Sequence, residues 1–192
     1  VLFFLWIAFT VLTVMAFFAI LFTGRYPRGI FEFNVGVLRW TWRISFWSYS
    51  ALGTDRYPPF SLGPEPGYPA TLEVTPPERL SRGLVLVKWW LLAIPHYIVV
   101  SIFTGSAWAY VWSDDFGWVG WGWGGLIGLL VFFAAVALLF TGRYPRGIFD
   151  LVVGLNRWVF RVSAYAALMR DVYPPMRLDP GPREPPVGRR EG

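Results

Sequence analysis

The chain has 192 residues, of which 55% are hydrophobic, 20% aromatic and only 15% charged, and it contains no cysteine. Without cysteine it cannot form a disulfide framework, a thiolate metal site or a cysteine nucleophile. In so apolar a chain, the net charge of +5 indicates anionic lipid or an acidic partner rather than nucleic acid.

Three stretches are long and apolar enough to cross a lipid bilayer. Val1 to Phe22 and Gly124 to Thr141 carry no charge, and Leu84 to Phe103 carries only Lys88 and His96. At about 1.5 Å of rise per helical residue, each covers roughly the 30 Å of hydrocarbon in a membrane. The first stretch has no basic residues before it and no cleavage pattern, so it is not a secretory signal. The sequence therefore predicts an all-α polytopic membrane protein with three spanning helices.

The segment LFTGRYPRGIF occurs twice, at Leu21 to Phe31 and at Leu139 to Phe149. Glycine permits unusual backbone angles and proline fixes its own, so each copy predicts a turn at the end of an apolar helix, with Arg and Tyr in the headgroup layer. The similarity continues at the same spacing to Ser45 and Ser163. The chain is therefore an internal duplication.

The duplication divides the chain into two repeats, a linker and a tail. The repeats cover 1–62 and 80–178, and the segments 63–79 and 179–192, rich in proline and glycine, are predicted to be a cytoplasmic linker and tail with little regular structure. The first repeat has no counterpart of Leu84 to Phe103, so we expect it to be truncated and the parent protein to have four spanning helices. Two spanning helices per repeat would make an internal parallel repeat, with its pseudo-two-fold axis along the membrane normal.

A helix with one polar stripe is predicted after each turn, because arginine, carboxylate and glycine recur there at spacings of three and four residues. We expect these two amphipathic helices to lie in the cytoplasmic interface with their arginines towards phosphate headgroups. Alternatively, the arginines pair with the carboxylates and let the helix pack on the bundle. A transmembrane course is disfavoured, since two arginines would lie near the bilayer centre. The candidate lipid- or partner-binding residues are Arg25, Arg28, Arg39, Arg43, Arg143, Arg146, Arg157 and Arg161.

The distribution of charge predicts the orientation in the membrane. All 17 lysines and arginines lie in Arg25 to Lys88 or in Arg143 to Arg190, whereas the Trp-rich loop from Thr104 to Trp123 carries two aspartates and no cation. By the positive-inside rule, both TGRYPRGIF segments, the linker and the C-terminus are expected in the cytoplasm and the Trp-rich loop outside. Lys88 is expected to extend along its helix to the cytoplasmic interface.

Four motifs together resemble a known family. They are VKWWLLAIPHY at Val87 to Tyr97, the FTGRYPRGIF turn, the R-W-x-x-R helix and the Tyr-Pro-Pro that closes each copy. The family consists of uncharacterised bacterial, largely actinobacterial, multi-pass membrane proteins and is known only as a domain of unknown function. The resemblance implies a bacterial plasma membrane, and it brings no activity, substrate or catalytic residue.

Two further features are candidates for function or packing. His96 is the only histidine, and an ionisable group at membrane depth is a functional suspect that could bind a haem iron or pass a proton. Alternatively, its neutral imidazole hydrogen-bonds a neighbouring helix. Gly120, Gly124 and Gly128 recur every four residues, a pattern typical of close helix packing. No metal cluster can be assembled from this chain, and no cofactor is expected.

These features favour a protein that is not an enzyme. We interpret it as an accessory or scaffolding subunit of a bacterial plasma-membrane complex, with anionic lipids and other membrane subunits, or copies of itself, as partners. The alternative is a small transporter or channel built from the two repeats. A transporter should place polar residues opposite one another between its spanning helices, and the nearly featureless apolar stretches favour the scaffold. A membrane enzyme or haem protein that uses His96 ranks last.

Overall fold

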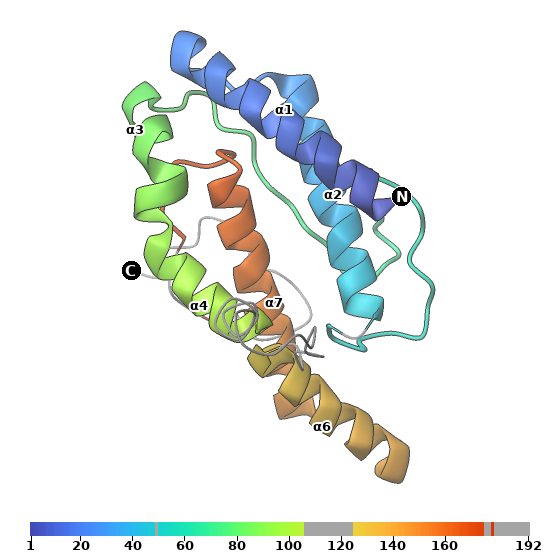
Figure 1. The fold of residues 1–192 in the computed structure, drawn as a ribbon. Coiled ribbons are helices and arrows are strands. Elements are labelled where there is room, and N and C mark those ends of the chain that lie inside the picture. Colours follow the sequence, from blue (N-terminus) through green and yellow to red (C-terminus); the bar gives the residue numbers. More distant parts are fainter. Residues whose placement is uncertain (49, 106–124, 175–177, 179–192) are drawn as a thin grey trace, which may run out of the picture.

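A computed structural model describes residues 1–48, 50–105, 125–174 and 178. In these residues the chain forms helices and no strand, so the predicted all-α class is confirmed for this part of the protein. The helices are α1 (Leu2–Thr23), α2 (Arg28–Trp47), α3 (Arg82–Val87), η1 (Lys88–Leu92), α4 (Ile94–Thr104), α6 (Gly125–Thr141) and α7 (Arg146–Ala166) (Figure 1).

The two LFTGRYPRGIF segments form the same turn. Gly24 and Gly142 end the apolar helices with φ angles of 70° and 64°, in the left-handed region where glycine avoids the strain of a Cβ atom. The hydroxyl oxygens of Thr23 and Thr141 both accept a hydrogen bond of 3.2 Å from the backbone N–H two residues later. Each copy is therefore a helical hairpin, α1–α2 or α6–α7, with a turn that the local sequence determines.

The second expected spanning helix is not straight. Between Arg82 and Thr104 the chain passes through the π-helical turn η1, and α4 begins anew at Ile94, at an angle of 42° to the preceding segment. Pro95 lies in the first turn of α4, where a missing N–H costs no helical hydrogen bond, whereas further into a helix it would break one. The expectation of one continuous helix over Leu84 to Phe103 is therefore wrong, and His96 lies near the start of α4.

The helices differ in whether they are long enough to cross a membrane. By length and composition, α1 is the single candidate span among the described helices, and the bent segment from Arg82 to Thr104 passes the same test if its two parts are counted as one. Helix α6 is apolar but shorter.

The amphipathic helices α2 and α7 lie in the centre of the protein and run in opposite directions (Figure 1). Trp42 and Phe160, which occupy equivalent positions in the two copies, contact each other with ring centroids 5.3 Å apart. The hydroxyl of Tyr26 at the start of the first copy reaches Ala167 at the end of α7. These contacts relate the two copies by an approximate two-fold axis perpendicular to α2 and α7.

The apolar helices α1 and α6 also run in opposite directions (Figure 1). A parallel repeat relates its two copies by a two-fold axis along the membrane normal. The structure has a two-fold relation between the copies, and the direction of its axis relative to a membrane stays a prediction. The relation results from the packing of the apolar faces of α2 and α7 against each other.

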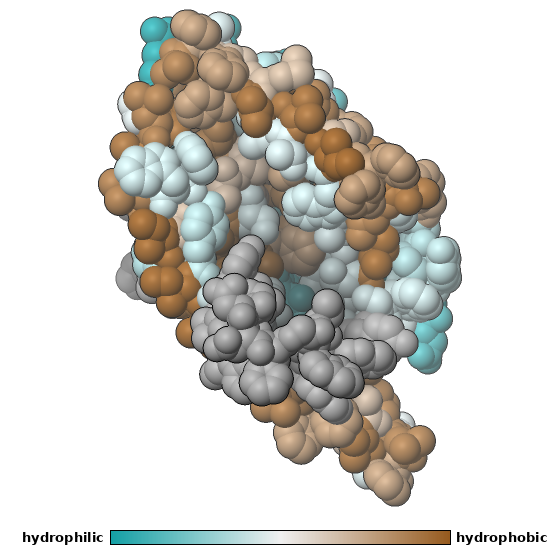
Figure 2. All heavy atoms as spheres, viewed as in Figure 1, coloured by the Kyte–Doolittle hydropathy of each residue, from teal (hydrophilic) through white to brown (hydrophobic). Residues whose placement is uncertain are grey.

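Hydrophobic side chains lie on the outer surface of the protein as well as in its core. Figure 2 shows them along α1, along α3 and α4, and along α6, with paler and more polar residues between these helices. On α1 the exposed large side chains are Phe3, Phe4, Ile7, Val11, Val14, Met15, Phe18 and Phe22. A soluble monomer rarely exposes so long a continuous apolar surface.

Candidate functional site

The eight candidate arginines divide into an exposed group and a covered group. Those in the turns and first helical residues, Arg25, Arg28, Arg143 and Arg146, are exposed. Those further along the amphipathic helices are buried or half-buried: Arg39, Arg43, Arg157 and Arg161. Position along the helix, rather than membership of the polar stripe, therefore decides which guanidinium groups are accessible.

The covered arginines of the first copy bind the end of the first repeat and the linker that follows it. Arg43 donates hydrogen bonds to the backbone oxygens of Ser61, at 2.7 Å, and Gly63, at 2.5 Å. Arg39 donates from Nε to the backbone oxygen of Leu72, at 2.9 Å. Arg43 is only 2% exposed, so the expectation that it faces lipid headgroups is wrong, whereas for the half-buried Arg39 this stays a prediction. Since backbone carbonyls of the linker have no partner in a strand or helix, the arginines satisfy them.

Glycine makes the close approach of the linker possible. A Cβ atom on Gly36 would lie 2.8 Å from the Cβ of Leu62 and 2.9 Å from its backbone oxygen. The linker therefore packs against the polar stripe of α2. Burial lowers the pKa of the Arg43 guanidinium, and nearby Glu65 opposes this effect; an arginine pKa starts so high that the group stays charged near neutral pH.

The second copy keeps the same stripe in a different setting. Arg157 is only 9% exposed and Arg161 is half-buried on α7. No segment equivalent to the linker follows α7 within the described residues, because 179–192 lie outside them. The two copies therefore share a helix pattern, and the linker contacts described for the first copy involve Arg39 and Arg43.

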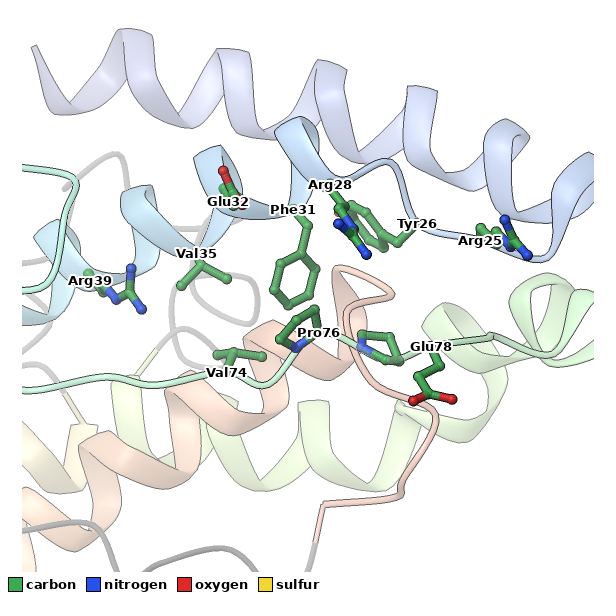
Figure 3. Close-up of a pocket in the computed structure, with 11 residues that line it drawn as sticks. Arg25, Tyr26, Arg28, Phe31, Glu32, Val35, Arg39, Val74, Pro76 and Glu78 are labelled. Carbon is green, nitrogen blue, oxygen red and sulfur yellow. The ribbon is translucent and has the colours of Figure 1, made fainter.

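A cleft of about 880 Å³ lies between α2 and the linker (Figure 3). One wall comes from the first turn and α2, and the other from the linker between Val74 and Glu78. The lining residues are Arg25, Tyr26, Arg28, Phe31, Glu32, Val35, Arg39, Val74, Pro76, Pro77 and Glu78. The linker was predicted to have little regular structure, and its contribution to a cleft was not predicted. The Pro76-Pro77 pair that stiffens this wall was the available signal.

His96 is completely buried, and its ring lies among aromatic rings. Its centroid is 4.6 Å from that of Tyr173 and 6.2 Å from that of Trp158. Neither ring nitrogen has a hydrogen-bond partner, so the structure lacks the expected hydrogen bond to a neighbouring helix. Tyr173 belongs to the Tyr-Pro-Pro motif of the second copy, which gives that motif a packing role against α4.

Lys88 is also completely buried, and it forms a salt bridge of 3.1 Å with Asp171. Its ammonium group lies 4.9 Å from the ring centroid of Tyr165. The expectation that Lys88 extends to the membrane interface is therefore wrong. Asp171 also accepts a hydrogen bond of 2.7 Å from the backbone N–H of Ser81, so one carboxylate ties the start of the bent segment to the end of the second copy.

The expected glycine stripe is only partly within the described residues, since Gly120 and Gly124 lie outside them. Gly128 lines a cavity of about 560 Å³ beside α4 and α7. The close approach occurs instead at Gly125, where a Cβ atom would lie 2.3 Å from the backbone nitrogen of Gly105. In the described part of the chain, no three His, Asp or Glu side chains gather where they could hold a metal ion.

A family model described as Domain of unknown function (DUF4389) matches the chain twice, over residues 1–61 and 116–177. Each match contains one of the two helical hairpins. The VKWWLLAIPHY motif at Val87 to Tyr97 lies outside both matches. No curated protein and no solved structure matches the chain.

Proposed function

The chain belongs to this family of domains of unknown function, with two copies of the domain, and from this premise we propose a non-enzymatic role in a bacterial plasma membrane. The proposed protein is an integral membrane subunit that serves as an accessory or scaffold within a larger membrane complex. Its partners are anionic lipids and other membrane subunits or further copies of itself.

The observation that carries this proposal is the apolar outer surface of α1. Phe3, Phe4 and Phe22 are each at least 70% exposed, and burial of apolar surface is worth about 25 cal/mol per Å². A surface of this kind is stable in contact with lipid tails or with a neighbouring helix. Only α1's inner side, with Phe9, Ala16 and Ile20, packs on the rest of the chain.

The exposed arginines of the two turns support contact with anionic lipid. Arg25 and Arg28 follow directly after the apolar helix α1, and Arg143 and Arg146 follow directly after α6. This is the position at which a basic side chain reaches the headgroup layer from the end of a membrane helix. Each such residue gains about 1 kcal/mol near an anionic membrane surface.

The charge distribution favours a cytoplasmic location for both turns. Because α1 and α6 run in opposite directions, both turns lie on one side of a membrane only if the two-fold axis stands along the membrane normal. In that arrangement α2 and α7 lie parallel to the membrane surface, which is the position expected of amphipathic helices. Helices α1 and α6 then enter the lipid with opposite tilts.

The polar groups buried between α1 and α2 favour a scaffold over a transporter. Asn34 donates hydrogen bonds to the hydroxyl oxygens of Tyr26, at 3.0 Å, and Thr13, at 3.2 Å. These two hydrogen bonds hold the hairpin together, which is a structural use of polarity between helices, while the buried amide oxygen of Asn34 has no hydrogen-bond partner among the described residues.

A gentle detergent pulldown tests the proposal. The tagged full chain is cross-linked in intact cells and purified, and its partners are identified by mass spectrometry. We expect a reproducible set of membrane proteins that is absent from a control with an unrelated membrane protein expressed at the same level. Purification of the chain alone, with no partner and no self-association after cross-linking, would contradict the scaffolding role.

A further inference from the structure

The cleft beside α2 has a positively charged interior that the fold does not use. Arg25 and Arg28 line it and are exposed, and neither forms a salt bridge within the described residues. Arg39 lines the cleft as well, and its Nε is bound to the linker. Three guanidinium groups around one concave surface repel one another unless an anion lies between them.

The two carboxylates of the cleft do not neutralise this interior. In Figure 3 the guanidinium groups of Arg28 and Arg39 extend towards the space between α2 and the linker. The carboxylate of Glu78 points away from α2 in the same view. With three arginines and two glutamates in its lining, the cleft keeps a net positive charge, which favours an anion.

The rest of the cleft is apolar and rigid. Phe31 and Val35 of α2 face Val74 and Pro76 of the linker across the gap (Figure 3). Proline has a fixed φ angle, so this wall loses little conformational entropy when a ligand is bound. An anion that carries a short apolar portion would therefore be held at both ends, by arginine on one side and by this wall on the other.

We propose that the cleft between α2 and the linker is a binding site for a phosphate ester, with Arg25 and Arg28 as its principal phosphate ligands. Arginine is suited to phosphate because its planar group can donate two parallel hydrogen bonds. The helix α2 also begins at Arg28 with no side-chain cap, so free backbone N–H groups and the positive end of the helix dipole lie beside the same wall.

Among the described residues, the linker forms the second wall of this site in the first copy. Arg143 and Arg146 repeat the two ligands in the second copy, but the second wall of the cleft is the linker, which packs on α2. The duplication thus provides a matched control, because each phosphate ligand has an exposed counterpart with the same local sequence and no opposite wall among the described residues.

The test measures ligand binding to the purified full chain in detergent. The two probes are short-chain phosphatidylglycerol and inorganic phosphate, and the variants are Arg28→Gln and its counterpart Arg146→Gln. We expect Arg28→Gln to weaken binding about tenfold, the loss of one charge-assisted hydrogen bond. In a non-ionic detergent, which offers the exposed Arg146 no anionic membrane surface, Arg146→Gln should leave binding within about twofold. A second matched pair, Arg25→Gln and Arg143→Gln, should behave likewise, and circular dichroism checks that all four variants keep their helix content.

The two probes distinguish the source of the phosphate. Binding of phosphatidylglycerol without competition from inorganic phosphate assigns the site to a lipid headgroup, and this result rests on the proposed membrane location. Competition by inorganic phosphate assigns it to soluble phosphate esters. Equal losses in both members of each pair, or no binding of either probe, would overturn the site. Failure of the wild-type chain to appear in the membrane fraction would instead overturn the proposed function.

Discussion

Tyr26 and Tyr144 occupy the same position in the two copies, and each donates a hydrogen bond to the backbone of the other copy. Tyr26 reaches the carbonyl oxygen of Ala167 at 3.4 Å, and Tyr144 reaches that of Ala51 at 3.0 Å. Both acceptors lie just beyond the end of an amphipathic helix. The turn of one hairpin is thereby fastened to the end of the other at both ends of the α2–α7 pair.

Replacing either tyrosine with phenylalanine should lower the stability of the protein. Each change removes one buried hydrogen bond and leaves a carbonyl without its donor, at a cost of about 1 kcal/mol. Tyr26→Phe should cost more, because the hydroxyl of Tyr26 also accepts a hydrogen bond from Asn34. Denaturant unfolding in detergent measures the difference. Tyr57→Phe is the control, since Tyr57 is 77% exposed, and a Tyr144→Phe variant as stable as this control would contradict the fastening role.

The same hydroxyls predict a loss of stability at alkaline pH. Burial raises the pKa of both Tyr26 and Tyr144 from about 10 to about 12. Because the folded state holds these protons more tightly than the unfolded state, the contribution is complete below pH 10 and is lost as the pH rises towards 12. Unfolding measured between pH 9 and pH 12 should show this decline. The double Phe variant should start lower and decline less, and an equal decline in both proteins would refute the assignment.

Alanine at two glycines of the same helix should have opposite effects. Gly36→Ala should be destabilising, because its Cβ would lie 2.9 Å from the backbone oxygen of Leu62 and would displace the linker. Gly29→Ala meets nothing within 4 Å and should be neutral or stabilising by up to about 1 kcal/mol. Limited proteolysis of the linker and denaturant unfolding report both effects. Equal stability of the two variants would mean that the linker is not seated on α2.

The buried pair of Lys88 and Asp171 should respond unequally to the loss of each partner. Asp171→Asn leaves a fully buried ammonium group without its counterion, which should cost about 3 kcal/mol or more. Lys88→Met removes that charge, and Asp171 keeps partial exposure and the hydrogen bond from Ser81, so the cost should be nearer about 1 kcal/mol. The free energies of unfolding in detergent should therefore rank Lys88→Met above Asp171→Asn. The reverse order would indicate that the lysine is uncharged in the folded protein.

Cysteine labelling at the two turns tests the orientation. Gly29 and Gly147 are equivalent positions, both exposed, and an added side chain meets nothing at either. The chain has no cysteine of its own, so Gly29→Cys and Gly147→Cys each give one labelling site. Both should be protected from a membrane-impermeant maleimide in intact cells and labelled after permeabilisation. Labelling of one site from outside would show that the two turns face opposite sides.

The local structure was predictable from the sequence where neighbouring residues determine it. LFTGRYPRGIF encodes its own turn through Thr23 and Gly24, and the apolar helices α1 and α6 begin and end within one residue of their predicted bounds. What could not be predicted are contacts between distant segments. The sequence around Arg43 is the same whether its side chain binds a phosphate or the carbonyl of Ser61. No residue near Lys88 indicates that it pairs with Asp171, 83 residues later in the chain.

The relation between the copies was equally hidden from the sequence. A repeat spacing fixes which residues are equivalent, but it does not tell how the two units are oriented. That orientation follows from the packing of Trp42 against Phe160, and many aromatic pairings would satisfy the same pattern. The candidate site could not be predicted for a similar reason. One of its two walls belongs to a proline-rich segment without hydrophobic periodicity, so no sequence pattern indicates that this segment packs beside α2.

The contact between Trp42 and Phe160 also bears on how such a chain arose. A protein with a single hairpin would meet its own copy at this position across a symmetric dimer interface, since a two-fold axis brings equivalent residues together. When two such hairpins are joined in one chain, their association no longer depends on protein concentration. The two halves can then carry different residues at equivalent positions of the interface. Asn34 stands where the second copy has Val152, and Asn156 stands where the first has Leu38. The two halves therefore keep one shared contact between equivalent positions and differ at these buried polar ones.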